Sequence, residues 1–117
     1  MKKLVFYSYS KCSTCRKALK WLDQKNLEYK LIDIVKEPPL VEYLELALAQ
    51  FSEDNKSLFN TRGKSFQEIK IDIYKLSNEE IIKLLLSDGK LIKRPFLVHG
   101  GKIILGFNET EYSNHFI

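Results

Sequence analysis

The fold of this chain is decided by residues 4–18, which run Leu-Val-Phe-Tyr-Ser-Tyr-Ser-Lys-Cys-Ser-Thr-Cys-Arg-Lys-Ala. The apolar and aromatic opening predicts a buried strand over 3–8, and the run that follows predicts a helix over 13–24. Cys12 and Cys15, the only cysteines of the chain, therefore lie where a strand meets the start of a helix. The first N–H groups of a helix and its dipole stabilise negative charge, which favours the thiolate form of a cysteine there.

The pattern on either side of this motif predicts a β-α-β unit. Residues 28–34 alternate between polar and apolar types, as a second strand does. Asn26 is a plausible stop for the helix between the two strands. A strand, a helix and a strand in this order imply a parallel pair joined by a right-handed crossover.

The middle of the chain is predicted to be helical. Pro38-Pro39 opens a segment in which apolar residues recur at helical spacing over 40–50. A capping box is indicated at 65–68 and a second one at 77–80, each opening a further helix. The second of these helices ends near Asp88-Gly89.

The end of the chain predicts a hairpin followed by a helix. Residues 94–98 and 102–105 are strand-like, and Gly100-Gly101 forms the turn between them. Asn108 and Glu111 bracket a last short helix. The order of elements predicts an α/β fold with a thioredoxin-like mixed sheet (β-α-β … β-β-α) and a helical insertion.

The length of 117 residues predicts a single domain over 1–117, with a core of about 1–37 and 91–117 and the helical insertion at about 38–90. Hydrophobic residues make up 44% and charged residues 29%, as in a soluble globular protein. The net charge of +4 is spread along the sequence, so no direct nucleic-acid contact is expected. No apolar run has the length of a membrane span or a secretory signal, so we expect a cytoplasmic protein. The sequence leaves its oligomeric state open, with a monomer as the default.

In a reducing compartment a Cys-x-x-Cys is more often redox-active or metal-binding than a structural disulfide. Zinc needs four ligands, and His99 and His115, the remaining candidates, lie far along the sequence and are expected at the surface. We therefore expect no metal. Two inert buried cysteines are the other alternative. The favoured interpretation makes Cys12 the attacking thiolate and Cys15 the resolving thiol.

Several cations accompany the cysteines. Lys11 precedes Cys12 and Arg16 follows one helical turn later, and both favour the thiolate. Arg94, next to Pro95, could bind an oxyanion through its planar fork of donors. Arg62, in a turn, could do the same. The sequence leaves open whether these two arginines bind an anion or are simply solvated.

Five segments together resemble the ArsC/Spx family, which holds arsenate reductase-like proteins and regulators of the Spx and MgsR type. The segments are 11–18, 37–39, 59–62, 91–95 and 106–109, and the resemblance spans essentially the whole chain. It implies a thioredoxin-like fold with a helical insertion, a cis peptide at Arg94–Pro95 facing the thiol, and no bound cofactor. Glutathione with glutaredoxin, or thioredoxin, would serve as electron donor and partner.

In the arsenate reductases of this family one cysteine attacks arsenate and three arginines hold the oxyanion. Cys12 matches that cysteine, and Arg62 and Arg94 match two of the arginines. Gly106-Phe107 stand where the third is expected. Ser8 stands where a histidine is expected four residues before the cysteine. A small oxyanion is thus an expected substrate, but the site lacks two of the residues that the arsenate reductases of this family use.

Cys15 instead resembles the Spx branch, where the cysteine pair is a redox switch and the protein binds the C-terminal domain of the RNA polymerase α subunit. The Spx branch carries a glycine in the contacting loop, and residues 52–56 here carry none. The sequence therefore predicts a thiol-dependent oxidoreductase of arsenate reductase-like type, with Arg16 supporting the thiolate. The alternative is an Spx/MgsR-like redox-sensing regulator that binds the RNA polymerase α subunit, and a third is a general disulfide reductase.

Overall fold

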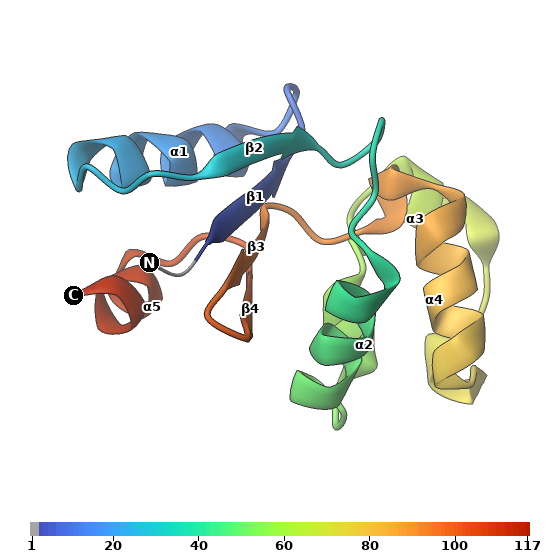
Figure 1. Ribbon diagram of the computed structural model, residues 1–117. Helices are drawn as coiled ribbons and strands as arrows, with labels where there is room; N and C mark the ends of the chain where they lie inside the picture. Colours follow the sequence, from blue (N-terminus) through green and yellow to red (C-terminus); the bar gives the residue numbers. More distant parts are fainter. Residues whose placement is uncertain (1–2) are drawn as a thin grey trace.

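The computed structural model describes residues 3–117, so the first two positions of the predicted core lie outside the described residues. Four strands form one mixed sheet in the order β2-β1-β3-β4, with helices on both faces (Figure 1). The strands are β1 (Leu4–Ser8), β2 (Lys30–Asp33), β3 (Phe96–His99) and β4 (Lys102–Leu105). The helices are α1 (Ser13–Gln24), α2 (Val41–Gln50), α3 (Lys64–Ile69), α4 (Asn78–Ser87) and α5 (Glu109–Phe116), with 3-10 turns η1 (Asn55–Leu58), η2 (Ile73–Lys75) and η3 (Gly89–Leu91).

The predicted β-α-β unit is present at the start of the chain. β1 and β2 run parallel, with Val5 opposite Lys30, and α1 joins them. The helix ends where Asn26 takes a left-handed φ of 57°, a conformation that asparagine tolerates. β2 is shorter than the predicted 28–34, although the N–H of the buried Ile34 still donates to the Ser8 carbonyl at 2.9 Å.

The predicted hairpin is also present. β3 pairs antiparallel with β1 on one side and with β4 on the other. Gly100 and Gly101 have φ values of 60° and 75°, the left-handed geometry that a two-residue hairpin turn requires. The α/β fold with a mixed β-α-β … β-β-α sheet is therefore confirmed.

The segment between β2 and β3 is helical, as predicted, but one of its two expected capping boxes is wrong. At the start of α4 the Ser77 side chain accepts from Glu80 N–H and the Glu80 side chain accepts from Ser77 N–H, so this box is confirmed. α3 begins one residue before Ser65, with Gly63 at its N-cap and no side-chain cap. Ser65 lies inside the helix, where its hydroxyl cannot cap the first turn.

Alternating residues of β1 divide the interior into two clusters. Val5 and Tyr7 pack with buried residues of α2 and α4, whereas Leu4 and Phe6 pack with those of α1 and α5. This alternation follows from the period of two in a strand. Figure 1 shows α1 and α5 together on one side of the sheet and α2 and α4 on the other. Within residues 3–117 no helix is both long and apolar enough to cross a bilayer.

The Gln50 side chain covers part of the outer edge of β4. Its amide donates to the Ile103 carbonyl and accepts from the Ile103 N–H at 3.0 Å. An edge strand otherwise presents unpaired backbone groups. The Gln50 amide thus pairs with both backbone groups of Ile103, as a residue of a further strand would, and it attaches α2 to the sheet.

We expect Gln50→Ala to lower the free energy of unfolding by about 1–3 kcal/mol, since two hydrogen bonds of roughly 0.5–1.5 kcal/mol are lost. Gln50→Glu keeps the acceptor but replaces the donor by a carboxylate oxygen that faces the Ile103 carbonyl, so it should lower the free energy of unfolding by at least the loss of one hydrogen bond. Urea denaturation measures both. Glu45→Ala, at an exposed position of the same helix, is the control. Equal effects of Gln50→Ala and Glu45→Ala would contradict the role assigned to the amide.

Candidate functional site

The topology brings the sequence-predicted cysteines and the Arg94–Pro95 peptide to one end of the sheet. Tyr7, near the end of β1, is paired with Phe96, the first residue of β3, and Phe96 is paired with Leu105, the last residue of β4. The segments that follow β1, precede β3 and follow β4 therefore meet at this end. They contain the cysteines, the Arg94–Pro95 peptide, which is cis as the resemblance implied, and Gly106.

Cys12 is the N-cap residue of α1. Its backbone is extended, with φ −101° and ψ 110°, and its Sγ accepts a hydrogen bond from the Cys15 N–H at 3.2 Å. Cys12 is half-buried, whereas Cys15 is buried. Sulfur thus takes the place of the oxygen that usually caps a helix, where N–H donors and the helix dipole stabilise a thiolate.

Cys15 lies beneath Cys12 and is fully buried. Burial, and to a smaller extent the hydrogen bond with Cys12, raise the pKa of its thiol to about 12. Hydrogen bonds from the Tyr9 backbone and from the Ser8 side chain act in the opposite direction. Both thiols are free in the structure. The pair therefore combines one accessible sulfur with one that stays protonated at neutral pH.

Aromatic rings close the interior side of Cys15. Tyr112 packs edge-on against Trp21 at 5.5 Å and against Phe107 at 4.8 Å between ring centroids. Burial raises the pKa of Tyr112 well above its usual range, with the nearby Cys15 adding to the rise. Its hydroxyl donates to the Gly106 carbonyl at 3.1 Å. Phe107, at the position of the missing arginine, thus belongs to the apolar cover of the cysteine pair.

Arg16 supports the loop that carries Cys12. Its Nη1 donates to the Ser10 carbonyl at 2.9 Å, although the side chain is largely exposed. This bond fastens the first turn of α1 to the residues before it. Lys11 is exposed in the same loop. The support of the Cys12 thiolate by these two cations stays a prediction.

Arg94 contacts Tyr9, which directly precedes this loop. Its guanidinium carbon lies 4.9 Å from the centroid of the Tyr9 ring, and its Nη1 donates to the Lys90 carbonyl at 3.2 Å. Pro95, which follows it, is buried. The structure thus places Arg94 next to the residues that lead into Cys12.

Arg62 is not brought to the cysteines by any contact. It is exposed in the turn that precedes α3, and within residues 3–117 it makes no hydrogen bond or ion pair with the Cys12 loop. At the position of the third arginine, the terminal methylene of Lys93 lies 3.5 Å from where a Cβ of Gly106 would stand. A lysine rather than an arginine therefore covers this end of β4.

The two histidines were expected as separate surface residues, and that expectation is wrong. His99 Nδ1 and His115 Nε2 are 2.8 Å apart, so the pair links β3 to α5. Both side chains are half-buried. In the part of the chain that the structure describes, no three His, Cys, Asp or Glu side chains form a group that could hold a metal ion.

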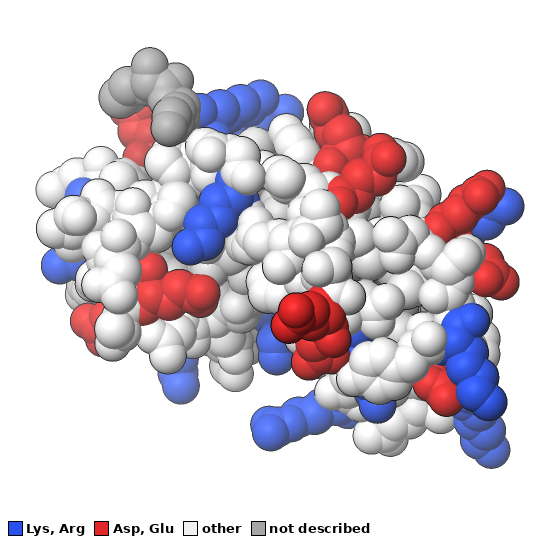
Figure 2. All heavy atoms as spheres, turned by 90° about the horizontal axis from the view of Figure 1, so that it is seen from below, with Lys and Arg blue, Asp and Glu red and all other residues white. Residues whose placement is uncertain are grey.

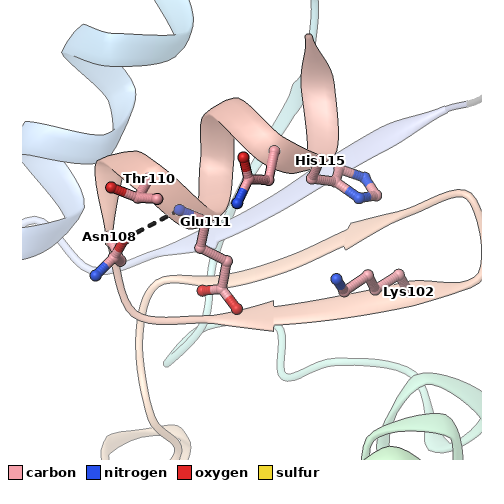
Figure 3. A pocket seen from close by; sticks show the side chains of 6 residues that line it. Lys102, Asn108, Thr110, Glu111 and His115 are labelled. Atoms are coloured by element: carbon pink, nitrogen blue, oxygen red, sulfur yellow. Dashed lines mark hydrogen bonds between the residues drawn. The ribbon is translucent and has the colours of Figure 1, made fainter.

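Several surface hollows lie outside the cysteine pair. One, of about 570 Å³, lies over β4 and α5, where Figure 3 shows the side chains of Lys102, Glu111 and His115. Another, of about 510 Å³, is lined by residues that include Thr61 and Lys93. Figure 2 shows acidic and basic side chains interspersed across one face of the molecule, with no broad patch of one sign there.

The residues that sequence reasoning missed are Tyr9, Ser8 as a partner of Cys15, and Tyr112. Tyr9 acts through its ring contact with the distant Arg94, Ser8 through the loop that brings Cys15 back beside it, and Tyr112 through a ring whose place depends on how α5 packs on the sheet. Tyr9 had one available signal, because it directly precedes the Ser10-Lys11-Cys12 loop. The spacing of residues along the sequence held no signal that could have identified Tyr112.

Comparisons with known proteins agree with this geometry. Residues 7–115 match the ArsC family. YusI of Bacillus subtilis (strain 168) is 40% identical over 114 residues, covering 96% of this chain and 97% of YusI. The global transcriptional regulator Spx 2 of Bacillus anthracis is 32% identical over 108 residues, covering 92% of this chain and 82% of the regulator.

Structural similarity points the same way. The crystal structure of a possible arsenate reductase from Streptococcus mutans UA159 superposes with a TM-score of 0.88 at 40% identity, covering 99% of this chain and 100% of that one. The thioredoxin-like fold expected from the sequence is thereby confirmed. Relatives of this chain carry the names of reductases and of regulators alike. The chain belongs to the ArsC family.

Proposed function

We propose that this protein is a thiol-dependent oxidoreductase of arsenate reductase-like type, with Cys12 as nucleophile and Cys15 as resolving thiol. The observation that carries the proposal is the 3.2 Å hydrogen bond from Cys15 N–H to Cys12 Sγ in the first turn of α1. It holds an accessible sulfur at a helix N-terminus, with a second thiol buried beside it. A thiolate at such a position is the reactive form of cysteine.

The first step is attack by the Cys12 thiolate. With arsenate, a bond forms between Sγ and arsenic(V), and one arsenate oxygen leaves as water after protonation. With a disulfide, a bond forms to one sulfur, and the other sulfur leaves as a thiolate. The N–H donors of the first turn of α1 stabilise the negative charge before attack.

The second step uses Cys15. Its thiol gives up its proton and attacks Cys12 Sγ, which forms the intramolecular disulfide. With arsenate, the sulfur–arsenic bond breaks and its electron pair goes to arsenic, which leaves as arsenite. With a disulfide, the bond between Cys12 Sγ and the substrate sulfur breaks, and that sulfur leaves as a thiolate. The raised pKa of Cys15, about 12, keeps it neutral until this step, and the bonds from Ser8 and Tyr9 stabilise the thiolate as it forms. Two electrons from glutathione with glutaredoxin, or from thioredoxin, then restore both thiols.

Arginines supply the charge for an oxyanion. Arg94 contacts Tyr9 beside the loop that carries Cys12, Arg16 donates to Ser10 within that loop, and Arg62 lies on the insertion. Arginine suits this role because its planar fork matches two oxygens of one anion. We propose Arg94 as the principal anion-binding residue, with Arg16 supporting the loop.

The experiment measures NADPH-coupled reduction of arsenate and, in a separate assay, of a small disulfide. The glutathione–glutaredoxin and thioredoxin systems are run apart. We expect turnover with at least one substrate and one donor, and an oxidised form that has lost two hydrogen atoms by mass spectrometry. Absence of turnover with both substrates and both donors would overturn the proposal.

A second candidate is a redox-sensing regulator that binds the C-terminal domain of the RNA polymerase α subunit. Similarity to Spx 2 over 92% of this chain favours it. Within residues 52–56, Asp54 accepts a hydrogen bond from the Tyr74 hydroxyl at 2.9 Å, so the loop is attached to η2. Co-purification of the reduced and oxidised protein with that domain tests this candidate, and failure of both forms to bind would remove it.

A further inference from the structure

Tyr9 lies between β1 and the loop that carries Cys12, and its ring contacts Arg94. The guanidinium carbon is 4.9 Å from the ring centroid, within the range of a cation–π interaction. On another side, Arg94 Nη1 donates to the Lys90 carbonyl at 3.2 Å. The ring and the carbonyl together hold the guanidinium in one place, although it belongs to a long and flexible side chain.

The backbone of the same residue serves both cysteines. The Tyr9 carbonyl accepts from Cys12 N–H at 3.0 Å, and the Tyr9 backbone also makes a hydrogen bond to Cys15. These contacts fix the Tyr9 backbone relative to the thiols, and the half-buried Tyr9 side chain packs against the core cluster that contains Tyr7. Through that ring, the place of Arg94 is fixed relative to the thiols as well.

We propose that Tyr9 is a positioning residue that holds the Arg94 guanidinium ready for an anionic group reacting at Cys12. This inference rests on the proposed nucleophilic role of Cys12. A free arginine side chain loses much rotamer freedom when it binds an anion, and a guanidinium already held over a ring loses less. Tyr9 thus compensates in part for the arginine that Gly106-Phe107 replace, because it makes one of the remaining arginines more effective.

The experiment compares two alkylating reagents at Cys12, the anion iodoacetate and neutral iodoacetamide. The ratio of their rates reports the attraction of Cys12 for an anion and needs no turnover. We expect Tyr9→Leu to lower this ratio on the order of fivefold, the size of a partly exposed cation–π contact. Tyr9→Phe keeps the ring face and should restore the wild-type ratio. Tyr74→Leu is the matched control, since it removes a tyrosine ring from beneath Lys56 on the insertion.

A double-mutant cycle ties the effect to Arg94. If Tyr9 acts through the guanidinium, Tyr9→Leu combined with Arg94→Gln will lower the ratio no more than Arg94→Gln alone. With arsenate as substrate, Tyr9→Leu should raise KM more than it lowers kcat. An unchanged ratio in Tyr9→Leu, equal losses in the Leu and Phe variants, or additive losses in the double variant would each overturn the inference. A lowered ratio in a protein without turnover would sustain it while the proposed reductase activity fails.

Discussion

Cys12→Ser will abolish reduction of arsenate and of disulfides, with a loss of about 10³-fold or more, because a serine hydroxyl stays protonated and is a poor nucleophile at neutral pH. The substitution changes one atom at the N-cap of α1, and serine is itself a favoured N-cap residue. The fold should therefore be retained, which circular dichroism checks. The loss then reports the chemistry of the sulfur rather than damage to the helix.

Cys15→Ser is the matched variant and should fail at a different step. Cys12 still attacks, but no buried thiol is present to resolve the adduct. We expect the protein to accumulate a mixed disulfide with a small disulfide substrate, which intact-mass measurement detects, while Cys12→Ser accumulates none. Turnover in Cys12→Ser, or adduct formation that is equal in the two variants, would contradict the assignment of the two roles.

Local signals explain how much of the fold could be predicted. The helix predicted over 13–24 is α1 itself, and the cap predicted at Ser77 is present. Both depend on residues within one or two turns, where spacing and capping chemistry act directly. The cap predicted at Ser65 is wrong because the preceding turn, with its hydrogen bond from Gly63 N–H to Asn60 O, starts the helix earlier.

The candidate site shows the same difference between local and long-range contacts. Cys12, Cys15 and Arg16 lie within one helical turn of each other, so their proximity follows from the sequence. The contact of Tyr9 with Arg94 joins residues 85 positions apart, that is 94 minus 9, and depends on the antiparallel pairing of β1 and β3. The His99–His115 pair depends likewise on how α5 returns to the sheet. Such contacts are products of topology, which the local pattern does not specify.

Alkaline pH will destabilise the reduced protein in a way that Cys15 accounts for. The folded protein raises the pKa of this thiol from 9.0 to about 12, chiefly through burial. Below pH 9 the thiol is protonated in both states, so its contribution to stability is fully present. Above pH 9 the unfolded chain loses the proton while the folded chain keeps it, and stability falls until about pH 12.

The size of this effect follows from the shift of about 3 units between 9.0 and about 12, which corresponds to up to about 4 kcal/mol. Urea denaturation at several pH values from 8 to 11 under reducing conditions measures the slope. Cys15→Ala removes the titrating group, so its free energy of unfolding should fall less steeply over this window, whatever its stability at pH 8. Tyr112→Phe separates the contribution of the buried phenol, whose pKa is also raised and which begins to act near pH 10. Parallel slopes in the wild type and Cys15→Ala would show that the buried thiol is not protected as the structure requires.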